Sequence, residues 1–437
     1  MNRVALSDAP SRPVFPVLPA QDSAEWALLL ACLRSRFDPA ATETVAAAAR
    51  AGVDPTRLAE IARRHRVGGL VMRRLRTAGV ADLEAASEVA TAAETAGVRG
   101  LRMASGLARV LDLFGEAGIR PLALKGPIMA AELYGDVGAR PSGDLDLLVR
   151  ADDQTQARHT LVKAGFRADP PLDEQGALDY LAAGFAYSFR DDAQDLIVEV
   201  HPSLAHRDFR FEPDMEQLWD RAIPARIAGR TVLTLSPEDR FLFLCVHGAK
   251  HEWDQLIWVC DVAEAIRSGD VLDWTIIARQ AVETGSLRML QLGVHLANAF
   301  TGVTLPLEAA VLASRPGMDH LARQVWGRML DPIERKPTLW RQLRFHRGVR
   351  ERAAERWGQT REKVSDRIRT FARSARLMVA PSDTDRSFVE LPDSLSALYY
   401  LVRPVRVLVG SRRRADAEAV PREGARSMGF DGEPGAE

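Results

Sequence analysis

Two aspartates separated by a single residue are the feature of the sequence with the clearest chemistry. Asp144 and Asp146 open the alternating segment DLDLLVR, which predicts a β-strand. Residues i and i+2 of a strand point to the same face, so the two carboxylates are expected close together. Like charges at such a distance raise each other's pKa unless a cation lies between them, and hard oxygen ligands favour Mg²⁺ or Mn²⁺. A solvated strand end is the structural alternative for this pattern.

A second predicted strand carries a third carboxylate and a histidine. Glu199 and His201 alternate within LIVEVH at 196–201, so they also share a face. The segment FAYSFR at 185–190 precedes it, and the acidic DDAQD between them predicts a hairpin turn. Three carboxylates on neighbouring strands are enough for a two-metal site that acts on phosphate groups. His201 is expected either to tune Glu199, to meet substrate, or to serve structure alone.

The predicted secondary structure that must position these residues changes along the chain. Its 437 residues, with 46% hydrophobic and 27% charged, are typical of a globular protein of two or three domains. Helical periodicity dominates 23–118, strands alternate with helices over 119–226, and helical patterns return over 227–410. Residues 1–22 are Pro-rich and predicted to be loose, and 411–437 are predicted to be disordered. We therefore predict an α+β fold with a small mixed sheet flanked by N-terminal and C-terminal helical regions.

The net charge and the cysteines exclude some further classes of protein. A net charge of −1 excludes a protein that binds polyanions over its whole surface. The cysteines Cys32, Cys245 and Cys260 contain no CxxC pair, which excludes a cysteine-based metal site of that kind and is typical of a reducing compartment. No apolar run reaches about 18 residues and no secretion signal is recognisable, so we expect a cytoplasmic protein without a membrane span.

One segment departs from this neutral balance. Residues 321–376 hold 16 Lys and Arg against 6 Asp and Glu. A solvated helix face explains such a run, and a surface that docks RNA, an anionic lipid or an acidic acceptor is the sharper interpretation.

A longer block around the two aspartates resembles a known family. LKGPIMAAELYGDVGARPSGDLDLLV at 124–149 is similar to the signature of the uncharacterised nucleotidyltransferase family in the DNA polymerase β-like superfamily. That signature has a Leu-Lys-Gly turn, a helix ending in Leu-Tyr, and then Arg-Pro-x-x-Asp-x-Asp. VEVHPSL, IARRHRVGGLVMRRL and LSPEDRFLFLCVHGAKHEWDQLIWVCDVAEAI resemble further segments, so the likeness covers about 25–300.

The resemblance implies a mixed-sheet nucleotidyltransferase core and transfer of a nucleoside monophosphate from an NTP. It places Asp144, Asp146 and Glu199 on divalent metal, and Lys125 with Gly126 on the triphosphate. The wider superfamily has Ser after this glycine, whereas this chain has Pro127 and a longer gap to Asp144. A lysine is itself a good phosphate binder, although a solvated strand-end lysine is the alternative.

Other residues are expected at the edges of this site. Arg140 and Ser142, just upstream of the aspartates, are predicted to bind nucleotide, with a structural ion pair within the loop as the alternative for Arg140. His247 and His251 are four apart on a predicted helix and share a face. The resemblance suggests that they and Lys250 line the cleft near nucleotide or acceptor, and helix packing is the alternative.

The function predicted from the sequence is therefore metal-dependent nucleotidyl transfer with release of pyrophosphate. The acceptor, a hydroxyl or phosphate on a small molecule, peptide, protein or RNA, is not identified by any residue. Two other classes stay open. One is a catalytically silent protein of the same fold that senses nucleotide, and the other is a nucleic-acid-binding protein whose basic helices carry the function.

Overall fold

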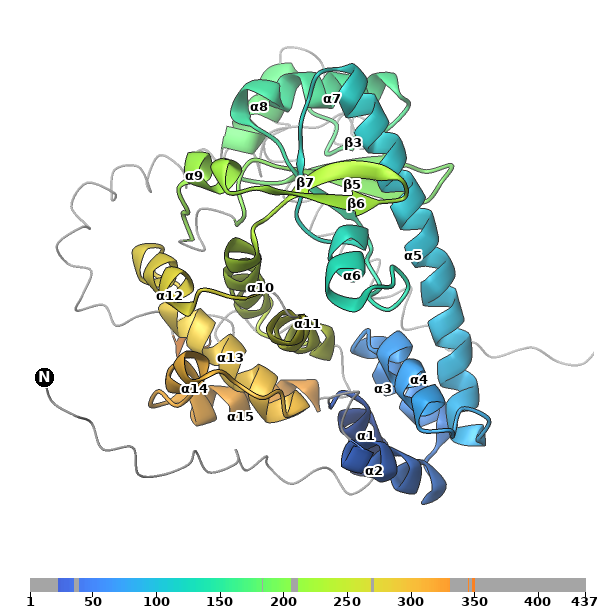
Figure 1. Ribbon diagram of the computed structural model, residues 1–437. Helices are drawn as coiled ribbons and strands as arrows, with labels where there is room; N and C mark the ends of the chain where they lie inside the picture. The colour runs from blue at the N-terminus through green and yellow to red at the C-terminus, as the bar shows by residue number, and fades with distance from the viewer. Residues whose placement is uncertain are drawn as a thin grey trace, which may run out of the picture. The chain divides into compact units, whose positions relative to one another are not determined.

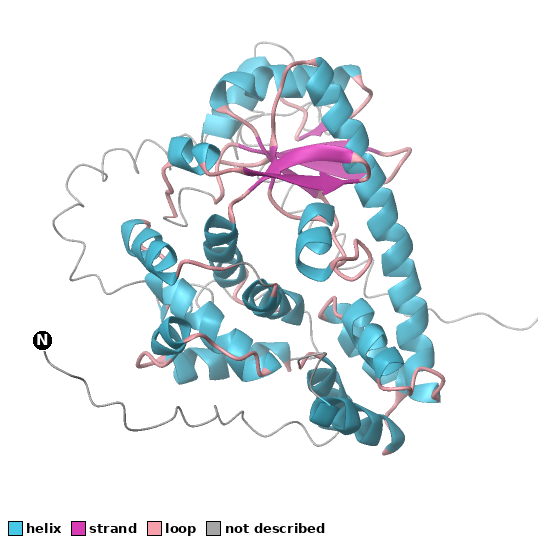
Figure 2. Ribbon diagram, in the orientation of Figure 1, coloured by secondary structure: helices cyan, strands magenta, loops and turns pink. Residues whose placement is uncertain are grey.

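The computed structural model describes residues 23–34, 39–182, 184–205, 211–268, 271–330, 345 and 348–349. They all belong to one compact unit, Met1–Ser365. The segments predicted to be loose or disordered, 1–22 and 411–437, lie outside the described residues, as does most of the basic segment 321–376. Within the described part, seven strands form one mixed sheet with helices on both sides, which confirms the predicted α+β class (Figure 1, Figure 2).

The described chain starts with a group of helices, as the periodicity predicts. These helices are α1 (Ser23–Cys32), α2 (Pro39–Arg50), α3 (Pro55–Arg64), α4 (Gly68–Thr77) and α5 (Glu84–Glu116). Asp54 starts α3 because its carboxylate accepts a hydrogen bond from the N–H of Arg57 at 3.0 Å, and Pro55 at the first position needs no such partner. The apolar face of α3 is buried.

The sheet has the strand order β3-β4-β5-β2-β1-β7-β6. β2 runs parallel to β5 and β1 parallel to β7, and the other neighbours are antiparallel. The predicted hairpin is present as β4 and β5. The last strand ends at Thr234, beyond the border predicted at 226, and the Thr234 hydroxyl donates to the Ala123 carbonyl at 2.8 Å. The strands are β1 (Leu122–Ala123), β2 (Leu145–Leu148), β3 (Arg167–Asp169), β4 (Tyr187–Asp191), β5 (Leu196–His201), β6 (Ile223–Ile227) and β7 (Arg230–Thr234).

Alternation along the central strands separates two faces of the sheet. Leu145, Leu147, Val198 and Val200 belong to a core shared with α5, α7 (Gln154–Lys163) and α8 (Glu174–Ala182). The residues between them, Asp146 and Glu199 included, therefore lie on the opposite face. That face turns toward α6 (Pro127–Tyr134), α10 (Pro237–Lys250) and α11 (Leu256–Arg267), which Figure 1 shows on the other side of the strands from α7 and α8.

Helix α10 closes this second face and is well defined by its sequence. Ser236 caps it, because its hydroxyl accepts from the N–H of Asp239 at 3.2 Å. After the helix, the ring of Trp253 folds back onto Gly248, where an added Cβ would lie 2.5 Å from the ring. The remaining described helices are α9 (Met215–Asp220), α12 (Trp274–Glu283), α13 (Leu287–Thr301), α14 (Leu307–Ala313), α15 (Met318–Met329) and the short 3-10 helix Ala151–Asp153. None of the helices in the described ranges combines the length and the apolar character that crossing a bilayer requires.

Candidate functional site

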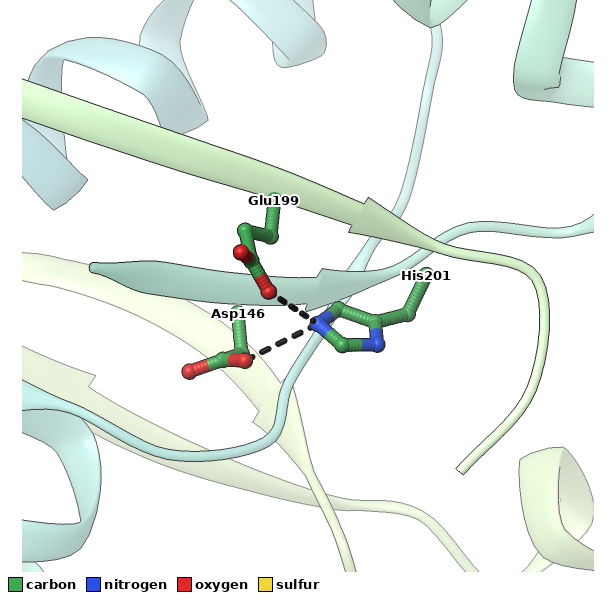
Figure 3. Close-up of side chains that lie close together, drawn as sticks. All are labelled: Asp146, Glu199 and His201. Carbon is green, nitrogen blue, oxygen red and sulfur yellow. Dashed lines mark hydrogen bonds and ion pairs between the residues drawn. The ribbon is translucent and has the colours of Figure 1, made fainter. Parts of the chain in front are cut away.

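The parallel pairing of β2 and β5 brings an acidic cluster together. Asp146 stands directly opposite Glu199 in this register. His201 lies two residues further along β5, and its Nε2 is 2.9 Å from Asp146 Oδ1 and 3.3 Å from Glu199 Oε2 (Figure 3). One ligand atom from each of the three residues lies within 4.8 Å of the others. Ser188 on β4 donates to Glu199 Oε1 at 3.3 Å and holds that carboxylate in place.

Asp146 is the centre of this cluster. Its side chain is fully buried, and Lys125 Nζ lies 2.9 Å from the same Oδ1 that contacts His201. Burial alone would raise the pKa of Asp146, but the charges and hydrogen bonds of Lys125 and His201 hold it well below its usual range. The other oxygen, Oδ2, is buried without a hydrogen-bond partner among the described residues. An ionised oxygen without a donor is a position at which a cation is favourable.

Asp144 lies at the edge of the cluster rather than inside it. β2 begins at Leu145, so the alternation that would align the side chains of Asp144 and Asp146 applies only from that residue onward. The half-buried Asp144 carboxyl has a pKa raised to about 6, first by burial and then by the charge of Asp146. Among the described residues, the compact group therefore has His201 as its third member.

The donor set fits a hard divalent cation. Carboxylates dominate it, and one buried carboxylate oxygen has no hydrogen-bond partner among the described residues. Crowded negative charge of this kind is stabilised by a metal ion, and oxygen-rich sites favour Mg²⁺ or Mn²⁺. Among the described residues, His247, His251 and Asp254 do not form such a group of metal ligands.

A glycine turn lies against the backbone that leads into β2. Gly126 has φ 73°, and an added Cβ would lie 3.1 Å from the Asp144 carbonyl and 3.6 Å from Ser142 Oγ. A side chain at this position would therefore be strained by its backbone conformation and crowded by the neighbouring loop. Ser142 is buried, and its carbonyl accepts from Arg99 Nε at 3.2 Å. The structure thus brings Gly126, Ser142 and Asp144 side by side, next to Lys125.

Arg140 is held by an aspartate that sequence reasoning missed. Its Nε lies 2.9 Å from both oxygens of Asp261 on α11, and its Nη2 lies 2.8 Å from Oδ2. Tyr134 donates to the same carboxylate at 2.8 Å. The ion pair considered as the alternative for Arg140 is present, but with a partner far away in sequence. A charged residue inside the apolar run WVCDVAEA was the signal for Asp261, because a buried charge requires a partner.

A second missed residue lies just after the end of helix α3. Arg66 adopts φ 57°, a left-handed conformation that is uncommon for a residue other than glycine. Desolvation and the charge of Arg140 lower the pKa of Arg66, while the charge of Asp144 raises it. The exposed Arg66 side chain therefore adds positive charge near the loop before β2. Nothing in its local sequence indicated this position.

The three predicted cleft residues of α10 share one face of the helix. His247 is half-buried, and Lys250 and His251 are exposed. Burial and the charge of Lys125 lower the pKa of His247 well below its usual value. Desolvation and the same Lys125 charge lower the pKa of Lys250, which the charges of Asp146 and Glu199 raise. The face of α10 is therefore within electrostatic reach of the acidic cluster.

Comparison with known proteins identifies the family of the chain. Searches of curated proteins and of solved structures found no match to the chain. A model of a protein family does match, over residues 51–302, which is more than half of the 437 residues and contains the whole acidic cluster. The family is described as uncharacterised nucleotidyltransferase, and the protein belongs to that family.

Proposed function

We propose that the protein is a metal-dependent nucleotidyltransferase that moves a nucleoside monophosphate from an NTP to an acceptor hydroxyl or phosphate. The observation that carries this proposal is the buried Asp146, whose Oδ2 has no donor among the described residues while Glu199 stands opposite it across two parallel strands. Family membership supports the same reaction class.

In this proposal Asp144, Asp146 and Glu199 hold the divalent cation, Mg²⁺ or Mn²⁺. The cation, when bound, would neutralise phosphate charge and favour ionisation of the attacking oxygen. His201 orients both Asp146 and Glu199, since its Nε2 contacts an oxygen of each. Because positioning and charge compensation supply most of the acceleration in phosphoryl chemistry, this rigid arrangement suits the reaction.

The positive groups next to the cluster are assigned to the triphosphate. Lys125 binds the β- and γ-phosphates together with the Gly126 N–H. Lys250 forms no ion pair among the described residues, so its ammonium is available to the same phosphates. Ser142 contacts the nucleotide from the loop. Arg140, predicted from the sequence as a phosphate ligand, instead positions this loop in our proposal, because its guanidinium is committed to Asp261.

The bond changes follow from this arrangement. An acceptor oxygen forms a bond to the α-phosphorus while the bond from that phosphorus to the bridging oxygen breaks, and pyrophosphate leaves. A proton released from an acceptor hydroxyl passes to Glu199, which is half-buried at the open end of the cluster. The acceptor is a small molecule, a peptide, a protein or RNA. We place the reaction in the cytoplasm, a proposal supported by the unpaired buried thiols of Cys32, Cys245 and Cys260.

Calorimetric titration of each NTP, with and without Mg²⁺ or Mn²⁺, tests the proposal. Metal-dependent binding is expected for the natural chain, and Asp146→Asn should weaken it at least about tenfold, because even residues that only support metal ligands cost that much. Asp152→Asn is the matched control, since Asp152 is an exposed carboxylate in the short helix after β2. NTP binding that depends neither on the metal ion nor on Asp146 would contradict the proposal.

A second measurement separates catalysis from sensing. Pyrophosphate release is followed with pooled small molecules, peptides or RNA as acceptors. Release that requires an acceptor and is lost in Asp146→Asn would support transfer. Metal-dependent NTP binding without release in any pool would favour the silent nucleotide sensor, which the missing serine after Gly126 left open.

A further inference from the structure

The C-terminal end of helix α10 has a polar, partly exposed face, although most of the helix is buried. Its neighbours Cys245, Val246, Gly248 and Ala249 are buried, whereas His247 is half-buried and Lys250 and His251 are exposed. Residues three and four apart lie on the same side of a helix. The polar face is therefore continuous over one turn, and the opposite side of the helix is fixed in the core.

Two rings on this face meet a tryptophan from α11. The ring centroids of His247 and His251 are 4.7 Å apart, and those of His251 and Trp258 are 5.1 Å apart with planes inclined by 34°. His247 meets Trp258 edge-on at 5.6 Å. Trp258 is only half-buried, unlike the fully buried Trp253 in the same segment. We call His247, His251 and Trp258 the ring cluster.

The ring cluster lies on the face of α10 that carries Lys250, and this face is within electrostatic reach of Lys125. The charges of Lys125 and Asp146 both act on His247, and Lys250 stands on the same helix face one turn away. Burial keeps the pKa of His247 well below its usual value, so its imidazole is neutral at neutral pH. A neutral planar ring beside ammonium groups suits a ligand that joins an aromatic group to a chain of phosphates.

We propose that the ring cluster is a stacking surface for the nucleobase of the NTP whose phosphates lie at Lys125 and Lys250. This inference rests on the proposed function and names the part of the substrate that this face receives. Stacking on aromatic side chains is tolerant of base identity because every base has a flat face. Purine nucleotides are therefore expected to bind more tightly than pyrimidine nucleotides, since a purine covers more of the ring surface.

The test compares ligands that do and do not carry a base. ATP, CTP and inorganic triphosphate are titrated in the presence of Mg²⁺ into the natural chain and into His251→Ala. ATP binding is expected to weaken about tenfold in this variant, within the range measured for loss of one stacking residue, and triphosphate binding is expected to stay unchanged. Trp258→Leu should weaken ATP at least as much, and Trp258→Phe, which keeps a ring, should recover most of the affinity.

A matched control uses a histidine far from this face. His159 on α7 is exposed, and His159→Ala should leave ATP and triphosphate binding unchanged. His251→Ala decides the test if Trp258→Leu fails to fold, because His251 is exposed and circular dichroism can verify its fold.

Four results would overturn the inference, and they differ in which other proposals they leave intact. Equal affinity of the natural chain for ATP and triphosphate, or equal losses for both in His251→Ala, would show that the rings do not touch a base while the triphosphate site stands. If His251→Ala binds ATP with unchanged affinity but releases pyrophosphate more slowly, the rings contact the acceptor and not the base. Failure of both ligands to bind the natural chain would reject the proposed function together with this inference.

Discussion

Arg140 and Asp261 form a buried ion pair that fastens the loop before β2 to helix α11. The arginine is 6% exposed, and its guanidinium meets the carboxylate through Nε at 2.9 Å and Nη2 at 2.8 Å. Tyr134 completes the group through its hydroxyl at 2.8 Å. Because Asp144 follows this loop, the position of one metal-binding candidate depends on a contact with a helix more than a hundred residues later.

Asp261→Asn is expected to destabilise the protein by about 3–5 kcal/mol, because the buried Arg140 charge loses its counter-charge. Tyr134→Phe removes a single hydrogen bond to the same carboxylate and should cost about 1–2 kcal/mol. Urea unfolding of the three proteins measures both values. Equal losses for the two variants would show that the ion pair is not what anchors this loop.

The same loop is held from its other side by a glycine of α5. A Cβ added to Gly100 would lie 2.3 Å from the carbonyl oxygen of Val137. Gly100→Ala is therefore expected to lower stability by about 1–3 kcal/mol despite the better helix propensity of alanine. Gly115→Ala on the same helix meets nothing within 4 Å and should stabilise by up to about 1 kcal/mol. Thermal unfolding measures both effects, and melting temperatures that shift in the same direction for the two variants would contradict this contact.

Under the proposed function, Lys125 would compete with a metal ion for Asp146 and would also help to bind the phosphates. Its ammonium lies on Asp146 Oδ1, so Lys125→Met should let Mn²⁺ alone bind about tenfold more tightly, because a positive charge has left the site. The same variant should bind the Mn²⁺ complex of an NTP more weakly. Calorimetry with Mn²⁺ in the absence and presence of NTP measures both effects. A parallel change of the two affinities would contradict this double role.

His65 is expected to make the folded protein less stable at acidic pH. It is completely buried, its Nδ1 accepts from the Leu256 N–H at 3.3 Å, and its Nε2 faces the Met329 carbonyl at 3.3 Å. Burial, with a smaller contribution from the Arg64 charge, lowers the pKa of His65 to about 3. Between that value and the unfolded value of about 6.5, the unfolded chain binds more protons, so stability falls as the pH falls.

The expected loss from this one group is about 2 kcal/mol between pH 6.5 and pH 4.5. Urea unfolding across this range measures it. His65→Gln should be less stable at neutral pH yet lose about 2 kcal/mol less over the interval, whereas His159→Gln, a change at an exposed histidine, should follow the natural chain. Parallel curves for His65→Gln and the natural chain would exclude this residue as the cause.

Much of the local structure follows from the sequence. Alternation in LIVEVH and FAYSFR predicts the β4–β5 hairpin, and Ser236 predicts the start of α10. The strand that carries Asp146 is predicted in the same way. These features depend on residues a few positions apart, so side-chain alternation and capping are sufficient to specify them.

The site itself depends on contacts between distant segments. The parallel register of β2 and β5 sets Asp146 beside Glu199, and the same register leaves His201 between them in place of Asp144. Asp261 is paired with Arg140 only because α11 packs near the loop before β2. The sequence by itself therefore determined the candidate residues and the strands on which Asp146, Glu199 and His201 lie. Tertiary structure decided which of them meet, because strand register and helix packing are set by the burial of whole faces and leave no local period in the chain.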